Sequence, residues 1–164
     1  MAHEFYVKMK GKKQGDFKGE SIRKEWDKFM TGLSFEYSVQ APRDIATGQA
    51  SGKRQHSPVI FTKEWGAASP QLLQALVTNE ILENVEFNFI KTDPSGKEIV
   101  YYVIKLTNAT VSKIAQGTSE EEEGGAKHEQ AYDVHEVEKV SLTFQKIEVE
   151  DKVGKTSALD DWKA

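Results

Sequence analysis

The strongest constraint on the fold is a strict alternation of apolar and polar residues in several short segments. The clearest case is segment 33–40, in which the odd positions are apolar and the even positions are polar. Successive side chains of a β-strand point to opposite faces, so this period of two predicts a strand with one buried and one wet face. Such strands are typical of antiparallel sheets. The chain is therefore predicted to be mainly β.

Further strands are predicted by the same alternation or by a high content of β-branched and aromatic residues. They are residues 5–9, 58–63, 85–90, 98–112 and 137–149. Within 98–112, residues 99–104 are apolar on both faces, which predicts burial from two sides or contact with a neighbouring chain. The polar, glycine-interrupted stretch 10–28 is predicted to be a loop with one helical turn near residues 22–26.

One segment predicts an α-helix. Apolar residues recur on one side of residues 72–77, Ser69 is a suitable N-cap, and Pro70 suits the first turn. We therefore expect a small antiparallel β-barrel or two-sheet sandwich with one short flanking α-helix. Residues 1–150 are predicted to form this single domain, with a long loop at 41–57, and residues 151–164 a polar C-terminal tail.

Composition narrows the function classes. The chain of 164 residues has no cysteine, which excludes a disulfide scaffold, a thiolate zinc site and a cysteine nucleophile. Its net charge is −4 and its basic residues are scattered among acidic ones, which disfavours nucleic-acid binding. It contains no apolar run long enough for a transmembrane helix, so no membrane partner is expected. The N-terminus lacks the apolar region of a secretory signal, which predicts synthesis and folding in the cytoplasm.

A search for catalytic or cofactor-binding motifs leads to no site. Segment 48–53 resembles a phosphate-binding loop, but it has three residues between its glycines where the motif needs four, and no helix follows. His128, Glu129, Asp133 and His135 are close in sequence, yet polar residues grouped in a loop are typical of a solvated surface. Glu120–Glu123 form an acidic run of the same kind. The sequence therefore predicts a protein that is not an enzyme and has no cofactor and no metal.

Two features each leave two explanations open on the residues alone. Segment 41–57 is a long polar loop, which is either a floppy surface excursion or an arm that reaches another chain. Trp162 lies among charged residues of the predicted tail, where it docks either on its own domain or on a partner.

Four segments in a fixed order carry a family resemblance. They read LSFEYSVQ at 33–40, PVIFTKEW at 58–65, ASPQL at 68–72 and EKVSLTFQKI at 138–147. Together with the glycine-containing loop between the first two, this series resembles the haemolysin-coregulated protein (Hcp) family, the tube protein of the bacterial type VI secretion system. The acidic loop 117–131 and the long tail depart from the usual pattern of that family.

The resemblance implies a structural protein. Members of the family form hexameric rings that stack into a hollow tube, which is enclosed by a contractile sheath, tipped by a spike protein and expelled from the cell. The ring cavity can hold small effector proteins. By this resemblance the chain is expected to be secreted without a signal peptide after assembly in the cytoplasm, and its polar strand face, at Glu36 and Ser38, to line the lumen. The corresponding inter-subunit loop would use Arg43, Asp44, Ile45, Thr47, Gln49, Ser51, Lys53 and Arg54.

Two other readings remain open on the residues alone. In a monomeric ligand-binding β-barrel, the wet face of segment 33–40 would line an interior pocket. In a hydrolase, surface carboxylates would supply the acid and base, but no pair of them stands out. A ring subunit differs from both because its exposed sheet edges are satisfied by neighbouring copies.

Overall fold

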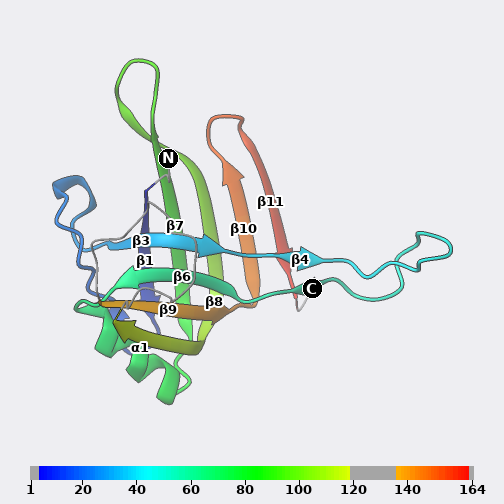
Figure 1. The fold of residues 1–164 in the computed structure, drawn as a ribbon, viewed down its shortest axis with the longest axis horizontal. Coiled ribbons are helices and arrows are strands. Elements are labelled where there is room, and N and C mark those ends of the chain that lie inside the picture. Colours follow the sequence, from blue (N-terminus) through cyan, green and yellow to red (C-terminus); the bar gives the residue numbers. More distant parts are fainter. Residues whose placement is uncertain (1–3, 119–135, 163–164) are drawn as a thin grey trace, which may run out of the picture.

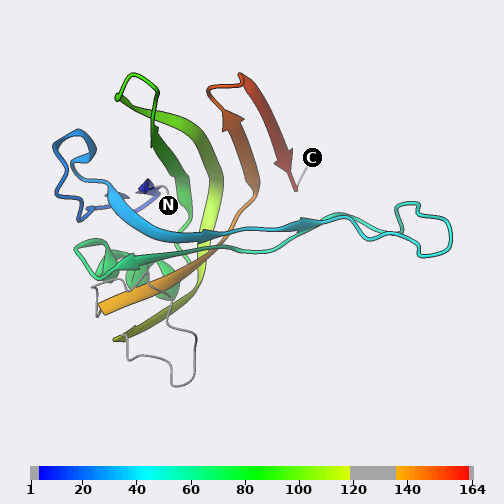
Figure 2. The same cartoon turned by 45° about the horizontal axis from the view of Figure 1, so that its top comes forward.

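The computed structural model of the chain describes residues 4–118 and 136–162. Within them the strands are connected mainly as an antiparallel sheet, with one α-helix and one short 3-10 helix (Figure 1). The elements are β1 (Phe5–Gly11), β2 (Gly15–Asp16), η1 (Lys24–Trp26), β3 (Met30–Glu36), β4 (Val39–Gln40), β5 (Gln55–His56), β6 (Val59–Glu64), α1 (Ala68–Val77), β7 (Leu82–Thr92), β8 (Glu98–Thr118), β9 (Glu136–Thr143), β10 (Lys146–Asp151) and β11 (Thr156–Asp161). The segment between β4 and β5 projects away from the rest (Figure 2).

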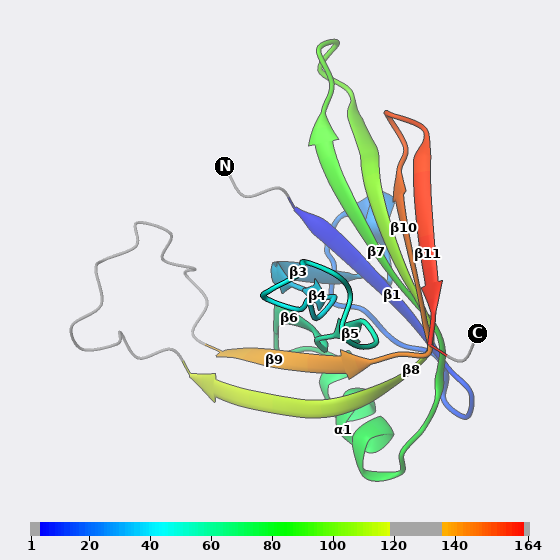
Figure 3. The same cartoon turned by 90° about the vertical axis from the view of Figure 1, so that its right-hand side faces the viewer.

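The sheet closes on itself because the long strand β8 has two partners on one edge. Its residues 110–118 pair with β9, and its residues 102–107 pair with β10. Through β9 the strands β8, β7, β1, β3, β6 and β9 form a closed antiparallel ring, while β10 and β11 extend the sheet outside it. Figure 3 shows β8 bending from that extension into the barrel. The predicted fold class, a small antiparallel barrel or sandwich with one flanking helix, is confirmed.

The barrel interior is filled with side chains. Phe87 is fully buried and meets the rings of Phe5, Phe35 and Phe61 at centroid distances of 6.4, 5.1 and 5.4 Å. The contacts with Phe35 and Phe61 are edge-to-face, an arrangement that adds to the stabilisation from burying apolar surface. Further fully buried members of this core are Val7, Met9, Val59, Leu72, Leu82, Val85, Leu106, Val140 and Leu142. The barrel is therefore a packed core.

A buried ion pair joins the barrel to the helix. Lys63 of β6 and Glu138 of β9 are both completely buried, with Lys63 Nζ 2.8 Å from Glu138 Oε1. Glu138 also accepts hydrogen bonds from Ser69 Oγ at 2.7 Å and from Gln116 Nε2 at 2.9 Å. Glu20 lies 3.8 Å from Lys63, in the segment 17–29 that we call the strap. One charged cluster thus holds two strands, the helix and the strap together.

The start of the helix differs from the prediction. The structure places the N-cap at Ala67, without a side-chain cap, and Ser69 inside the first turn of α1. Ser69 Oγ accepts a hydrogen bond from the Gly66 N–H and donates one to Glu138. Its hydroxyl is thus needed by the buried carboxylate, which the local sequence pattern does not reveal.

The C-terminal region also differs from the prediction. Segment 137–149 was predicted to be one strand, but it is two strands, β9 and β10, separated at Phe144 and Gln145. The predicted polar tail contains β11, which pairs along its whole length with β10. Strand β8 continues to Thr118, past the predicted start of the acidic loop. The rest of that loop, including Glu120–Glu123 and the His128, Glu129, Asp133 and His135 group, lies outside the described residues.

The strap covers the outer face of β1. Trp26 of η1 stacks on Tyr6 with ring centroids 4.7 Å apart, and Arg23 holds both carboxylate oxygens of Glu98 at 2.8 and 2.9 Å. The predicted helical turn near residues 22–26 corresponds to η1. Among the described residues, no helix combines the length and hydropathy required to cross a bilayer.

Candidate functional site

The long loop predicted at 41–57 is an extended hairpin, which we call the arm. Its root is the pairing of β4 with β5, in which Val39 faces His56 and Gln40 faces Gln55. A further bridge joins Arg43 to Ala50. The arm runs far beyond the barrel in both views (Figures 1 and 2). Segment 41–57 is therefore an ordered projection with its own backbone pairing.

The tip of the arm is a tight turn organised by one carboxylate. Asp44 Oδ1 accepts hydrogen bonds from the N–H groups of Ala46 and Thr47, at 2.7 and 3.2 Å. Gly48 follows at a φ of +71°, a conformation that glycine adopts without steric cost. The whole segment 43–55 is exposed, and Ile45 presents its entire apolar side chain to solvent. An apolar residue exposed at the end of a projecting hairpin is suited to insertion into another surface.

The root of the arm is tied to β11 by a polar cluster. His56 of β5 has a side chain only 3% exposed, and its Nε2 lies 2.6 Å from Asp160 Oδ2. The other ring nitrogen, Nδ1, lies 2.5 Å from the Tyr37 hydroxyl. Arg54 pairs with the same Asp160 carboxylate through Nε and donates from Nη2 to the carbonyl of Asp161 at 3.2 Å. We call Tyr37, Arg54, His56 and Asp160 the root cluster.

Aromatic rings enclose the imidazole. His56 lies 5.0 Å from the ring of Trp162 and 5.5 Å from that of Phe144, measured between centroids. The backbone N–H of Trp162 donates to the carbonyl of Gln145 at 2.9 Å. The open question about Trp162 is therefore answered for this structure: its ring docks on its own domain, although half of it stays exposed.

The electrostatics of the root cluster suit a permanent contact. Hydrogen bonds from Arg54 and His56 lower the pKa of the Asp160 carboxyl to about 2, so it stays ionised at ordinary pH. Burial and the charge of Asp160 raise the pKa of the Tyr37 hydroxyl. A Tyr–His–Asp series looks like an activated nucleophile, but a raised hydroxyl pKa disfavours the reactive anion. The arrangement therefore positions chain segments and is poorly suited to covalent chemistry.

The two residues expected on the wet face lie at the junction of barrel and arm. Glu36 ends β3 opposite Ile60 and is exposed. Ser38 follows between β3 and β4, also exposed, and its hydroxyl donates to Ser57 Oγ at 3.0 Å. Phe35, the residue before Glu36 in β3, points into the barrel and contacts Phe87. The predicted alternation thus places Glu36 on the outer surface of the barrel wall.

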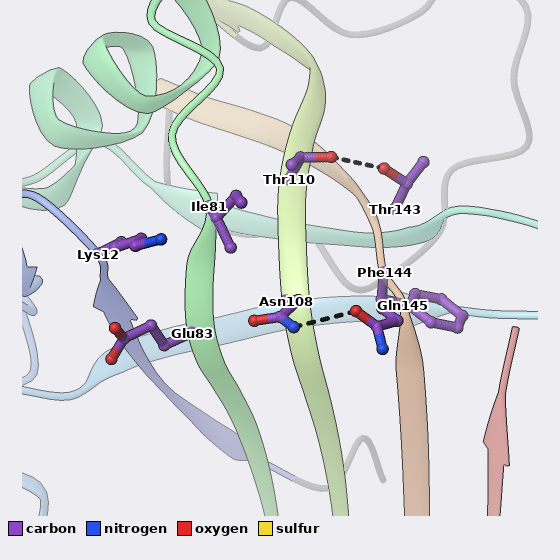
Figure 4. A pocket seen from close by; sticks show the side chains of 8 residues that line it. All are labelled: Lys12, Ile81, Glu83, Asn108, Thr110, Thr143, Phe144 and Gln145. Atoms are coloured by element: carbon purple, nitrogen blue, oxygen red, sulfur yellow. Dashed lines mark hydrogen bonds between the residues drawn. The ribbon is translucent and has the colours of Figure 1, made fainter. Parts of the chain in front are cut away.

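A pocket of about 450 Å³ lies where β7, β8 and the link between β9 and β10 meet (Figure 4). Its polar groups largely satisfy one another: Asn108 donates to Gln145 Oε1 at 3.0 Å, and the hydroxyls of Thr110 and Thr143 are 2.7 Å apart. Within the described ranges, the acidic and histidine side chains nowhere gather into a group that could hold a metal ion. The arm and its root are therefore the most distinctive feature of the described surface.

Comparison with known proteins decides the family. The family described as "Type VI secretion system effector, Hcp" matches residues 6–150. The chain belongs to the Hcp family. The resemblance read from the sequence is thereby confirmed, and membership makes the chain a type VI secretion system protein with a structural role, not an enzyme.

Related proteins match this Hcp chain over almost its full length. The "Major exported protein" of Pseudomonas aeruginosa is 31% identical, with 100% of this chain and 98% of the relative aligned. A solved Hcp protein has a TM-score of 0.86 at 28% identity, covering 98% of this chain and 100% of that chain. Hcp1 from Escherichia coli has a TM-score of 0.83 at 28% identity, covering 98% and 99%.

The arm is predictable from the sequence, but the contacts that hold its root are not. Of the residues expected to contact other subunits, Arg54 is engaged within its own chain, and Asp44 orders the turn at the tip. The partners His56 and Asp160 lie 104 positions apart, and no local motif links them. The available signals were weak: a lone histidine at the end of the loop, and a tryptophan beside two aspartates in an otherwise polar tail.

Proposed function

We propose that this chain is the subunit of the inner tube of a type VI secretion system. Copies close into hexameric rings, rings stack into a hollow tube, and the tube lies inside a contractile sheath behind a spike protein. The tube is expelled from the cell and carries small effector proteins in its lumen. The P. aeruginosa relative is named "Major exported protein", which supports the secretion step.

The arm is the observation that carries this proposal. It is ordered by backbone pairing and by the turn at Asp44, yet residues 43–55 are all exposed and only Arg54, at the root, is bound to another element of the described chain by its side chain. Ordering a segment costs conformational entropy, which burial normally offsets. A projecting hairpin with an exposed Ile45 at its end gains that burial on another copy. Strand β11 adds a second reason, because it ends the described sheet and leaves an edge open to pairing.

The alternative of a monomeric ligand-binding barrel gains no support from the packing. A ligand barrel needs an interior pocket, whereas the interior here is occupied by Phe61, Phe87 and Leu106, each fully buried. The pocket of Figure 4 is lined partly by the link between β9 and β10, and a second pocket, of about 360 Å³, is lined by residues of β8, β10 and β11, where the sheet extends outside the closed ring. The long polar arm also has no role in a solitary ligand-binding protein.

Size-exclusion chromatography with light scattering tests the proposal directly. We expect the purified chain to elute as a hexamer at micromolar concentration, and electron micrographs of that peak to contain annular particles. The interior packing predicts that dilution releases folded subunits, with an unchanged circular dichroism spectrum. A chain that stays monomeric at every concentration and gives no annular particles would refute the tube assignment.

Charge reversal at Glu36 tests the lumen assignment. The side chain is exposed at the end of β3, so Glu36→Lys is expected to leave folding and ring formation intact. If Glu36 and Ser38 face the lumen, the amount of a co-expressed effector protein recovered with the rings should change several-fold in this variant. The reason is that charged groups of the effector that residue 36 attracts in the parent chain are repelled in the variant, and the reverse. Glu25→Lys on η1, also exposed, is the matched control and should change neither property. Loss of rings in Glu36→Lys would contradict the lumen placement.

A further inference from the structure

The root cluster connects two parts of the chain that are far apart in sequence. Arg54 and His56 belong to the arm, and Asp160 belongs to β11 of the C-terminal hairpin formed by β10 and β11. One carboxylate oxygen, Asp160 Oδ2, receives contacts from both arm residues. The backbone pairing at the root is short, since β4 and β5 have two residues each and one further bond joins the Ser57 N–H to the Ser38 carbonyl. Side-chain contacts therefore contribute much of what holds the arm in one direction.

The root cluster lies where the arm leaves the barrel, so a small change of angle there moves the tip of the arm most. A two-residue pairing defines the direction of a long hairpin poorly, because an isolated short hairpin is marginally stable in water. Bonds to the rigid sheet at the root fix that direction, since β11 pairs with β10 over six residue pairs from Lys146–Asp161 to Asp151–Thr156. The Tyr37 hydroxyl and the ring of Trp162 hold the His56 imidazole from the remaining sides.

We propose that Asp160 is a positioning residue that locks the arm of its own subunit in the direction needed for binding the next copy. The inference rests on the proposed function for the role in assembly, but the lock itself is a property of one chain. A fixed arm lowers the entropy lost on association, which is how preorganisation raises affinity. The C-terminal hairpin thus works as the arm's anchor.

The Asp160 carboxylate keeps its negative charge over ordinary changes of pH. Hydrogen bonds from Arg54 and His56 lower its pKa to about 2, so it is protonated only in strong acid. The groups facing the carboxylate are the Arg54 guanidinium and the His56 imidazole from the arm; Tyr37 faces the imidazole from the β3–β4 link. The acceptor that both arm residues share is therefore ionised at ordinary pH.

Hydrogen exchange on the full-length chain tests the lock. In Asp160→Asn the amides at the arm root, including Ser57 N–H bonded to the Ser38 carbonyl, should exchange about tenfold faster or more, because a charge-assisted contact is lost. Asp160→Glu should restore much of the protection. Glu150→Gln removes an exposed carboxylate from the same hairpin and is the matched control. His56→Phe removes the contact by changing the arm and keeps Asp160, and it should also speed exchange of the arm-root amides.

Three outcomes would overturn the inference. Arm-root exchange in Asp160→Asn equal to that in Glu150→Gln would mean that no lock exists. Equal opening of β11 itself would mean that Asp160 holds the hairpin and not the arm. If Asp160→Asn loosens the root but leaves the concentration needed for association unchanged, the lock has no role in assembly. If the parent chain fails to associate, the proposed tube function is lost, whereas the exchange comparison still decides whether Asp160 locks the arm.

Discussion

Replacing Lys63 or Glu138 alone by alanine is expected to destabilise the fold by about 3–5 kcal/mol, the range for breaking a buried ion pair on one side. Each partner is completely buried, so the remaining charge has no access to water. Lys63 Nζ also donates to the Glu64 carbonyl at 2.8 Å, and Glu138 receives Ser69 and Gln116. Losing either residue therefore leaves several buried polar groups without a partner.

Denaturant unfolding at fixed protein concentration measures this loss, since association would otherwise shift the midpoint. The exposed pair Lys146–Glu148, with an N–O distance of 2.9 Å, is the matched control. Its side chains are about one-third exposed, so Lys146→Ala should cost about 0–1 kcal/mol. The double variant Lys63→Met with Glu138→Leu should lose less than either single alanine variant, because no charge is left buried. A single alanine variant as stable as Lys146→Ala would contradict this account.

The same cluster gives stability a defined dependence on pH. Burial alone would raise the pKa of Glu138, but hydrogen bonds from Lys63, Gln116 and Ser69 outweigh it, so the pKa lies below its ordinary value. Its contribution is then present above the unfolded-state pKa and is lost as pH falls through the folded-state pKa. The cost of Glu138→Ala should accordingly shrink in acid below the ordinary pKa of glutamate.

The contribution of Glu20 to stability depends on pH in the opposite direction. Burial raises its pKa, and the attraction of Lys63 offsets only part of that effect. Its Oε2 atom is buried and has no hydrogen-bond partner among the described residues. The contribution of Glu20 is present below its unfolded-state pKa and is lost as pH rises through the raised folded-state value. The two carboxylates beside Lys63 are therefore expected to contribute opposite pH dependences, because hydrogen bonds lower the pKa of Glu138 whereas burial raises that of Glu20.

Period-two alternation predicted the class of fold because it depends on burial, which every strand of the barrel shares. It placed β1, β3, β6 and β7 to within a few residues and correctly put Phe35 on the inner face of its strand, although Val39 of the same predicted face is exposed. Alternation cannot tell which strands pair, since every strand with one apolar face looks alike. The sequence therefore does not predict that β9 and β10 pair with the same edge of β8.

The division of segment 137–149 did leave a trace in the sequence. The buried positions are even at Val140 and Leu142 but odd at Ile147, so the buried face changes parity across Phe144 and Gln145. A change of parity marks a bulge or a new strand, because a shift of one residue moves every side chain to the other face. Asn108 on β8, opposite this break, has a φ of +50° and bends the strand there. Strand β11 gave a weaker signal, since Leu159 is its one large apolar residue and is exposed.

The candidate site was predictable as a segment but not as a geometry. The length and polarity of 41–57 indicated an arm, because a long loop without burial is uncommon in a compact domain. Its direction depends on His56, Arg54 and Asp160, which meet only after β10 and β11 have folded back along β8. Contacts made across such separations have no local sequence signature. The buried Lys63–Glu138 pair was missed for the same reason.

Removing the arm is expected to weaken self-association strongly while leaving the barrel folded. Replacing residues 41–54 by Asn-Gly would join Gln40 to Gln55, which already face each other across β4 and β5, through a two-residue turn of a favoured type. Residues 43–55 are exposed and contribute nothing to the core, so the unfolding midpoint of the subunit should change little. The concentration for half-assembly should rise at least about 100-fold, equivalent to about 2.8 kcal/mol per contact.

Light scattering across a concentration series measures this shift, and circular dichroism verifies the fold. The point variant Ile45→Asp separates the tip from the root: it keeps the backbone of the arm and the root cluster but places a charge where a fully exposed apolar side chain stood. It should weaken association in the same direction as the deletion, whereas Lys53→Gln, on the same arm, should do so less, because exposed charges contribute little to binding. Undiminished association of the shortened chain would mean that copies meet through the β11 edge or the barrel wall instead, and the arm would lose its assigned purpose.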